Sequence, residues 1–235
     1  MDSFLPVLLI GGFVALFAML AYYSYQQQQK RLADMTALAQ QLGWQFDPSR
    51  DSEHDGLYSQ FEIFRRGHSR YAYNTLHGTM TINGEQCPVK MGDFHYRVTS
   101  GSGKSRSTRT YEFSYAVVEL SYVRQPDLFI RAEGIFDSLA GALGFDDIDF
   151  ESAEFSKQFH VTSSDKRFAY DVVHSGMIEF LMGEEPPIVD IEAGKCCLTD
   201  GYRKWSPDEF QNRLEWSGRF FSLWPKHLVA TLKGV

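Results

Sequence analysis

Three acidic side chains in the second half of the chain have a spacing that could bind a metal ion. Asp147, Asp149 and Glu151 alternate with an isoleucine and a phenylalanine, and residues 146–154 contain two more acids. In an extended backbone, alternate side chains point to the same side, so these three carboxylates would share one face. Carboxylate oxygens are the ligands that hard divalent cations prefer. A metal-dependent enzyme or another hydrolase that uses residues 146–154 is therefore one interpretation.

The same alternation also fits the solvent-facing side of a half-buried strand. The segment has no glycine-turned calcium loop of the EF-hand kind. We therefore expect a structural segment here. On that interpretation the chain has no catalytic residue, and the metal site at Asp147, Asp149 and Glu151 is the alternative.

A second group of candidate residues is basic. Lys104, Arg106 and Arg109 lie within residues 99–110, a stretch rich in Gly, Ser and Thr. A Gly-Lys-Ser triplet in this stretch resembles the end of a phosphate-binding loop, but the glycine that the motif requires five positions earlier is missing. We predict a long flexible loop between two strands, whose three cations bind a partner.

The histidines and cysteines show no cofactor motif. The seven histidines are scattered, with no H-x-H or H-x-x-x-H pair. Cys196 and Cys197 are adjacent and lack the two-residue gap of a zinc knuckle. With Cys87 the cysteines are odd in number, so no disulfide framework is indicated. We predict structural or solvent-exposed roles for these side chains, and no cofactor.

The rest of the chain is organised around one apolar segment, residues 4–25. From Phe4 to Ala21 no side chain is charged, and 18 residues make a helix of about 27 Å. The three tyrosines that follow extend it to about 33 Å and would form an aromatic belt at a membrane surface. Asp2 and the lack of a basic start argue against a cleaved signal peptide. We predict a single-pass transmembrane anchor embedded in the lipid bilayer.

The charges beside this segment predict its orientation. Lys30 and Arg31 follow the apolar run, and no basic residue precedes it. Because basic residues favour the cytoplasmic side, residues 26–235 are expected in the cytoplasm, with the anchor in the inner (plasma) membrane.

The rest of the chain is predicted to form a helical stem, residues 26–43, and one soluble domain, residues 44–235. Apolar residues at helical spacing and a glycine at position 43 indicate the stem and its C-terminus. A hydrophobic content of 43% and an aromatic content of 15% are typical of a globular domain. The net charge of −7 argues against nucleic acid as a partner.

The pattern of the domain predicts an α+β fold: a mainly antiparallel sheet with packed helices, behind the transmembrane helix and its stem. Asn83-Gly84 is a strong hairpin signal between strands 70–82 and 85–98. Further strands are expected at 111–123, 128–131, 159–161, 188–191 and 196–198. Helices are expected at 57–67, 133–142, 165–182 and 206–223, the last of which begins with a capping box.

Several segments together resemble a known family. Residues 144–169 read G-F-x-x-I-D-F-E-S-x-x-F-S-x-x-F-x-V-x-x-x-D-x-x-x-A. Upstream, Gly67-His68-x-Arg70-x-Ala72-x-Asn74 and Gly92-Asp93-Phe94-x-Tyr96 occur in order. With the N-terminal apolar helix, these segments resemble a family of uncharacterised bacterial membrane-anchored proteins, a domain of unknown function. The resemblance implies a bacterial inner-membrane setting and one α+β domain, and it carries over no catalytic residue.

These observations lead to one expected function. We expect a single-pass membrane protein with a cytoplasmic, non-enzymatic binding or scaffolding domain and a protein partner of unknown identity. The alternative is the membrane-bound hydrolase or metal-dependent enzyme described above.

Overall fold

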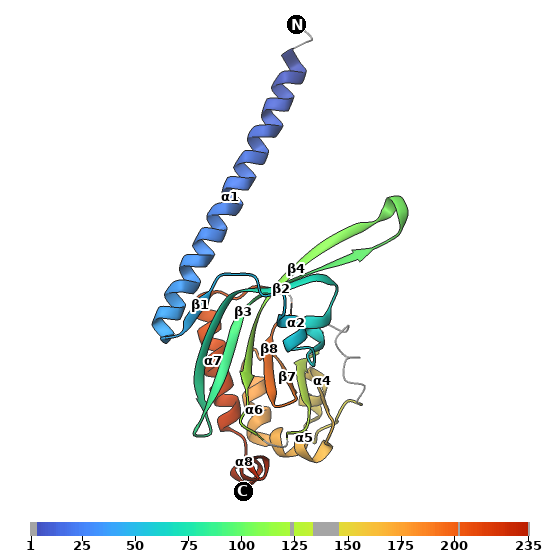
Figure 1. The fold of residues 1–235 in the computed structure, drawn as a ribbon. Coiled ribbons are helices and arrows are strands. Elements are labelled where there is room, and N and C mark those ends of the chain that lie inside the picture. Colours follow the sequence, from blue (N-terminus) through green and yellow to red (C-terminus); the bar gives the residue numbers. More distant parts are fainter. Residues whose placement is uncertain (1–3, 123–124, 134–145, 202, 235) are drawn as a thin grey trace.

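The structure is a computed structural model in which one antiparallel sheet carries helices on both faces (Figure 1). It describes residues 4–122, 125–133, 146–201 and 203–234; the side chains of residues 4–11 and of Lys104 are outside this description. The eight strands are β1 (Gln45–Asp47), β2 (His68–Ile82), β3 (Glu85–Ser100), β4 (Ser107–Glu119), β5 (Leu128–Ala132), β6 (Phe159–Ser163), β7 (Ile188–Glu192) and β8 (Lys195–Thr199). Their order in the sheet is β1-β2-β3-β4-β8-β7-β5-β6.

Helices connect and cover these strands. They are α1 (Phe4–Leu42), α2 (His54–Leu57), α3 (Glu62–Arg65), α4 (Ala153–Gln158), α5 (Lys166–Val172), α6 (Ser175–Gly183), α7 (Pro207–Ser222) and α8 (Lys226–Lys233), with a short 3₁₀ turn η1 (Gly103–Ser105). All neighbouring strands in the sheet are antiparallel. The predicted fold class, an α+β domain with a mainly antiparallel sheet and packed helices, is confirmed.

Local sequence signals account for several of these elements. Asn83 and Gly84 both have positive φ, 50° and 84°, and join β2 to β3 as the predicted tight turn. Helix α7 begins at the predicted capping box, in which Ser206 accepts from the Glu209 amide and the Glu209 carboxylate accepts from the Ser206 amide. The expected strands at 128–131, 159–161, 188–191 and 196–198 are confirmed within a residue or two at their ends.

The predicted flexible loop at residues 99–110 is wrong. β3 and β4 remain paired as far as Ser100 and Ser107, so only residues 101–106 form the turn. The cause is a ladder of β-branched residues that the Gly and Ser content obscured; in it the Thr99 and Thr108 hydroxyls lie 2.9 Å apart. Figure 1 shows this hairpin extending well past the domain. We call residues 97–111 the arm.

Three other expectations need correction or lie outside the description. The single helix expected at 57–67 is instead the pair α2 and α3, whose connection places Phe61 in the core. The helix expected at 165–182 is interrupted at His174, because the His174 ring accepts from the Gly176 amide and starts α6 anew. The helix expected at 133–142 lies almost wholly outside the described residues. β1, α4 and α8 were not predicted.

Each face of the sheet has its own apolar core. One face packs against α1, α4, α5, α6, α7 and α8, and includes Met35, Phe155 and Phe220. The other face packs against α2 and α3, and its centre is aromatic. There His54 is fully buried, with its ring centroid 4.6 Å from those of Phe64 and Tyr115. The long helix therefore belongs to the packing of one face only.

Helix α1 is continuous from Phe4 to Leu42 and ends at Gly43, which has a φ of 67°. Its last turns pack on the sheet through Met35, Leu38 and Ala39, and the rest extends away from the domain (Figure 1). Within the described part of the chain, no helix combines the length and the apolar character that crossing a membrane requires. The predicted transmembrane segment, residues 4–25, begins with eight side chains outside that part.

The core position of Phe155 gives a first prediction. Its fully buried ring lies 5.4 Å from the ring of Phe150 and 4.7 Å from that of Phe159. Phe155→Ala should lower the free energy of unfolding by about 3–5 kcal/mol, because the ring leaves a cavity. The exposed carboxylates nearby serve as the control: Asp149→Asn with Glu151→Gln should change it by about 0.5 kcal/mol or less. Urea titration followed by tryptophan fluorescence measures both, and an equal loss in the control would give the carboxylates a structural or ligand-binding role.

A second prediction concerns acid stability. Burial, and then the charge of Lys90, lower the pKa of His54 from 6.5 to about 3. Between pH 6.5 and about 3, His54 is protonated in the unfolded chain but neutral in the folded protein. The free energy of unfolding therefore decreases as the pH falls below 6.5, by up to about 1.4 kcal/mol per pH unit. His54→Leu should remove this part of the acid destabilisation between pH 6.5 and 4.5, whereas exposed His227→Leu should not. Parallel pH slopes for wild type and His54→Leu would contradict the prediction.

Candidate functional site

A buried ion pair joins α1 to the sheet. The Arg31 guanidinium meets the Asp93 carboxylate in a two-pronged arrangement, with Nη2 2.6 Å from Oδ1 and Nε 3.0 Å from Oδ2. Asp93 is fully buried in the middle of β3. Paired donors of this kind fix orientation as well as distance. The helix therefore leaves the domain in a direction that this contact helps to set.

Neighbouring groups complete the hydrogen bonds of this pair. Ser114 Oγ donates to Asp93 Oδ1 at 2.7 Å, and Asn74 Nδ2 donates to Oδ2 at 3.2 Å. Arg31 also donates to the backbone carbonyl of Trp205, at 2.5 Å. Asn74 lies at a register shift of β2, with a φ of 50°, where a bulge re-aims the side chain. The buried charges are thus satisfied from α1, three strands and the start of α7.

Beyond this joint, α1 exposes a long apolar surface. The large exposed side chains along it are Phe13, Val14, Leu16, Phe17, Met19, Leu20, Tyr22, Tyr23 and Tyr25, all more than half exposed. Soluble monomers rarely expose a continuous apolar surface of this length. In Figure 1 the domain contacts only the other end of the helix. This surface therefore takes no part in the packing of the domain.

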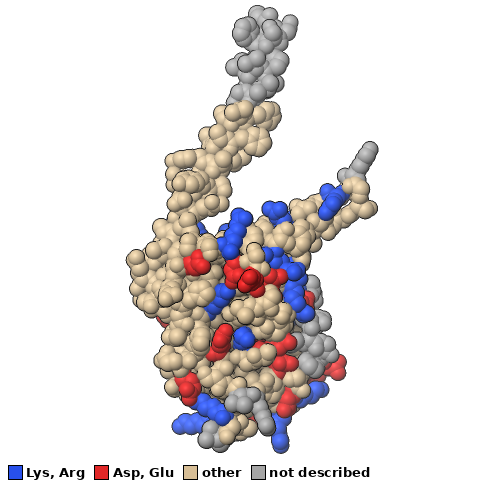
Figure 2. All heavy atoms as spheres, in the orientation of Figure 1, with Lys and Arg blue, Asp and Glu red and all other residues tan. Residues whose placement is uncertain are grey.

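The arm carries the predicted partner-binding cations. Arg106 and Arg109 are exposed in the turn and at the start of β4, and the side chain of Lys104 lies outside the described residues. Arg97 is exposed at the base of the arm, and no acidic residue occurs from 97 to 111. Figure 2 shows basic side chains along the arm. The structure therefore places Arg106 in the turn and Arg109 on the paired part of one hairpin, where the sequence predicted a flexible loop.

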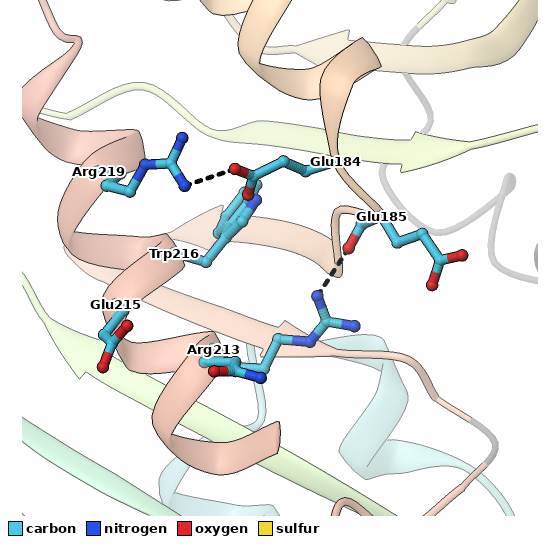
Figure 3. Close-up of a pocket in the computed structure, with 7 residues that line it drawn as sticks. Glu184, Glu185, Arg213, Glu215, Trp216 and Arg219 are labelled. Atoms are coloured by element: carbon cyan, nitrogen blue, oxygen red, sulfur yellow. Dashed lines mark hydrogen bonds and ion pairs between the residues drawn. The ribbon is translucent and has the colours of Figure 1, made fainter. Parts of the chain in front are cut away.

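A groove beside α7 is lined by charged residues (Figure 3). It has a volume of about 290 Å³ and lies between α7 and the segment that leads from α6 to β7. Arg219 pairs with Glu184, and Arg213 donates to the backbone carbonyl of Glu185 at 2.7 Å. Arg213 also reaches the buried Asp200 at 3.2 Å. Both arginines thus hold α7 to that segment, so the charged residues of the groove are explained by a structural role.

The acidic segment is split between two environments. Asp147 Oδ1 accepts from the amides of Ile148 and Val161, at 3.0 and 2.9 Å, and lies 3.3 Å from Nδ1 of His160. In the described residues, the group whose ligand atoms all lie within 4.8 Å is Glu133, Asp147 and His160. Asp149 and Glu151 are not part of it. The predicted trio of Asp147, Asp149 and Glu151 therefore does not converge on one point, and Asp147 is occupied with the backbone.

Asp149 and Glu151 instead border a wide hollow of about 820 Å³ that also includes His174. A catalytic site there would need a base, and His174 is the nearest imidazole to consider. Its Nε2 lies 2.9 Å from the Leu223 carbonyl and its Nδ1 accepts from the Gly176 amide at 3.1 Å. Both ring nitrogens are therefore engaged by the backbone, which leaves the ring without a lone pair for proton abstraction.

Other buried ionisable groups do not supply a nucleophile. Burial raises the pKa of Cys196 and Cys197 well above the usual range, and the carboxyl of Asp190 adds to the effect. Since the thiolate is the reactive form, these thiols are unreactive at neutral pH. Burial, followed by Glu192 and Asp127, also raises the pKa of Asp190 well above its usual range. This buried carboxyl lies on the α2–α3 side of the sheet, close to other acids.

Comparison with known proteins supports the fold alone. No protein-family model matches the sequence, and no curated protein matches it. The crystal structure of the mycobacterial trehalose monomycolate transport factor A, TtfA, is similar, with a TM-score of 0.53 over 82% of this chain and 93% of that chain. The two sequences are 10% identical, so the likeness is one of fold. The resemblance to a family of bacterial membrane-anchored proteins stays a prediction.

The buried joint gives a third prediction. Asp93→Asn should lower the free energy of unfolding by about 3–5 kcal/mol, because it leaves the Arg31 charge without its partner. Adding Arg31→Met should restore part of this loss, which a double-mutant cycle would measure. The half-exposed pair of Glu85 and Lys233 is the matched control, and Glu85→Gln should cost less than about 1 kcal/mol. Equal effects at the two sites would mean that the Arg31 contact does not hold the helix.

Proposed function

We propose that this protein is a single-pass membrane-anchored protein with a cytoplasmic binding or scaffolding domain. In this proposal residues 4–25 lie in the bilayer of the inner (plasma) membrane, and residues 44–235 form the domain, joined to the anchor by the stem 26–43. The observation that carries the proposal is the row of large apolar side chains that α1 exposes beyond the domain. A bilayer would cover that row, and the tyrosines at its end would lie at the headgroups.

The joint between stem and domain supports the scaffolding part of this proposal. A domain on a flexible tether samples many orientations, whereas α1 is continuous and is locked to β3 by Arg31 and Asp93. A protein held in this way presents the same face to the membrane surface at all times. Such a constraint favours a role in which position matters, such as holding a partner beside the membrane.

The charges agree with a protein partner better than with nucleic acid. The chain has a net charge of −7, and phosphate backbones are bound by clustered positive charge. Arg106 and Arg109, with Lys104, are the residues proposed to meet a partner. TtfA, the structural neighbour, is described as a transport factor, and an accessory role in transport is one form that the proposed binding function can take.

A membrane-bound hydrolase or metal-dependent enzyme that uses residues 146–154 remains the second candidate. The group formed by Glu133, Asp147 and His160 favours it. Against it, the Arg131 guanidinium lies 3.8 Å from Glu133 and competes with a metal for that carboxylate. The binding domain is therefore the proposal we favour.

The fourth prediction tests the anchor. The full-length protein should stay in the membrane pellet after alkaline carbonate extraction, and a phosphatase fused after Val235 should be inactive while a fluorescent protein at the same place should fluoresce. Leu16→Arg with Leu20→Arg should move the protein to the soluble fraction, since an arginine within a bilayer costs about 2.5–3.5 kcal/mol.

Its control places the same charges outside the proposed span. Gln27→Arg with Gln29→Arg should leave the protein in the pellet, because these positions lie in the polar segment after Tyr25. A wild-type protein that is extracted by carbonate would refute the anchor. An active phosphatase fusion would refute the cytoplasmic orientation and leave the anchor standing.

A further inference from the structure

We infer that the arm, residues 97–111, lies against anionic lipid headgroups of the same membrane that holds α1. This inference rests on the proposed anchor and extends it: the protein would touch its membrane at two places, the helix and the hairpin tip. Three observations carry it: the direction of the arm, its reach, and the chemistry of its exposed face.

The direction comes from the arrangement of the two longest elements. Figure 1 shows α1 and the β3–β4 hairpin leaving the same end of the domain, with the hairpin inclined away from the helix. The rest of the molecule lies on the other side of their common base. A membrane crossed by α1 would therefore lie on the side toward which the arm points.

The reach can be estimated from the contact that the two elements share. Arg31 of α1 and Asp93 of β3 are joined, so both lengths can be counted from that point. The helix rises about 9 Å from Arg31 back to Tyr25, and β3 runs about 26 Å from Asp93 to Gly101. Even at an inclination of roughly 60° to the helix the hairpin would rise about 13 Å. The tip therefore reaches the level of the tyrosines, where headgroups would begin.

The exposed chemistry of the arm matches an anionic interface. Directly paired residues of an antiparallel ladder point to the same side, so Val98 and Arg109 share a face with Tyr111. Val98 is 38% exposed and Tyr111 is 37% exposed, although both are apolar or aromatic. Arginine beside tyrosine and an aliphatic residue is the combination found at the membrane–water boundary. Four basic residues and no acid occur in the arm of a chain whose net charge is −7.

The experiment uses the full-length protein reconstituted into vesicles of phosphatidylcholine alone or of phosphatidylcholine with phosphatidylglycerol at 3:1. The native cysteines are buried, so the thiol introduced by Ser102→Cys at the exposed tip can be labelled with the polarity-sensitive dye NBD. We expect a blue-shifted emission in the anionic vesicles only, reversed by 0.5 M salt. Arg106→Glu with Arg109→Glu should abolish the shift, since each basic residue at an anionic surface strengthens attachment roughly fivefold.

The matched control reverses two charges at the other end of the domain. Lys166→Glu with Arg167→Glu on α5 changes the net charge equally and lies far from α1 in Figure 1, so it should leave the shift intact. Identical emission in the two kinds of vesicle, or a shift that survives in the arm variant, would overturn the inference. The variants' unchanged thermal midpoints would confirm that both are folded.

Flotation of the same samples separates this inference from the proposed anchor. Protein that floats with both kinds of vesicle but shows no lipid-dependent emission retains its anchor and refutes the arm contact, which would leave the arm for a protein partner. Protein that floats with neither refutes the anchor, and the arm contact with it.

Discussion

The buried contact between Arg31 and Asp93 fixes how the N-terminal helix is mounted on the domain. Removing both charges from water carries a desolvation cost of several kcal/mol per ion, so such a pair adds little net stability even with good geometry. Its consequence is specificity. Once Asp93 is buried in the sheet, a position of the helix that moves Arg31 away leaves a buried negative charge without its counter-ion, which costs several kcal/mol. Ser114 and Asn74 also donate to the carboxylate, but neither carries a positive charge.

A second close contact defines the axis of the same helix. Just past the end of α1, the indole of Trp44 lies directly over the backbone of Gly78 in β2, and a Cβ at that glycine would overlap the ring. Met35 and Leu38 lie between these two points along the chain and are buried in the core. Two points separated along one helix determine its direction, which a single point cannot do. The stem is therefore packed as part of the domain, and its contacts with the sheet set the direction of the free end of α1.

Two signals carried by neighbouring residues are confirmed in the structure. Asn83-Gly84 and the capping box at Ser206 each specify a local backbone geometry whatever surrounds them. The alternation at residues 147–151 also predicted burial, since Ile148 is buried and the acids beside it are exposed. Pairings between distant residues were not predictable in this way. Arg31 and Asp93 are 62 positions apart, and nothing in the sequence pairs this arginine with this acid. Asn74 and Asp93, from two separate segments of the chain, meet in a hydrogen bond of 3.2 Å, which gives both positions a structural role.

The arm is a paired hairpin although its composition indicates a flexible loop, and this difference affects how it could bind a surface. Gly and Ser between residues 100 and 107 suggested flexibility, but flexibility depends on what the flanking residues pair with. Thr99 faces Thr108, and Tyr96 stacks on Tyr111 with ring centroids 5.0 Å apart, so the ladder continues outward from the core. A two-stranded ribbon has marginal stability by itself, and here the domain anchors its base. A loose loop would lose conformational entropy on binding any surface, whereas a ribbon that is already ordered loses less. Arg109 lies on β4, which pairs along its length with β3, the strand that carries Asp93, so one pair of strands connects the arm to the contact that holds the helix.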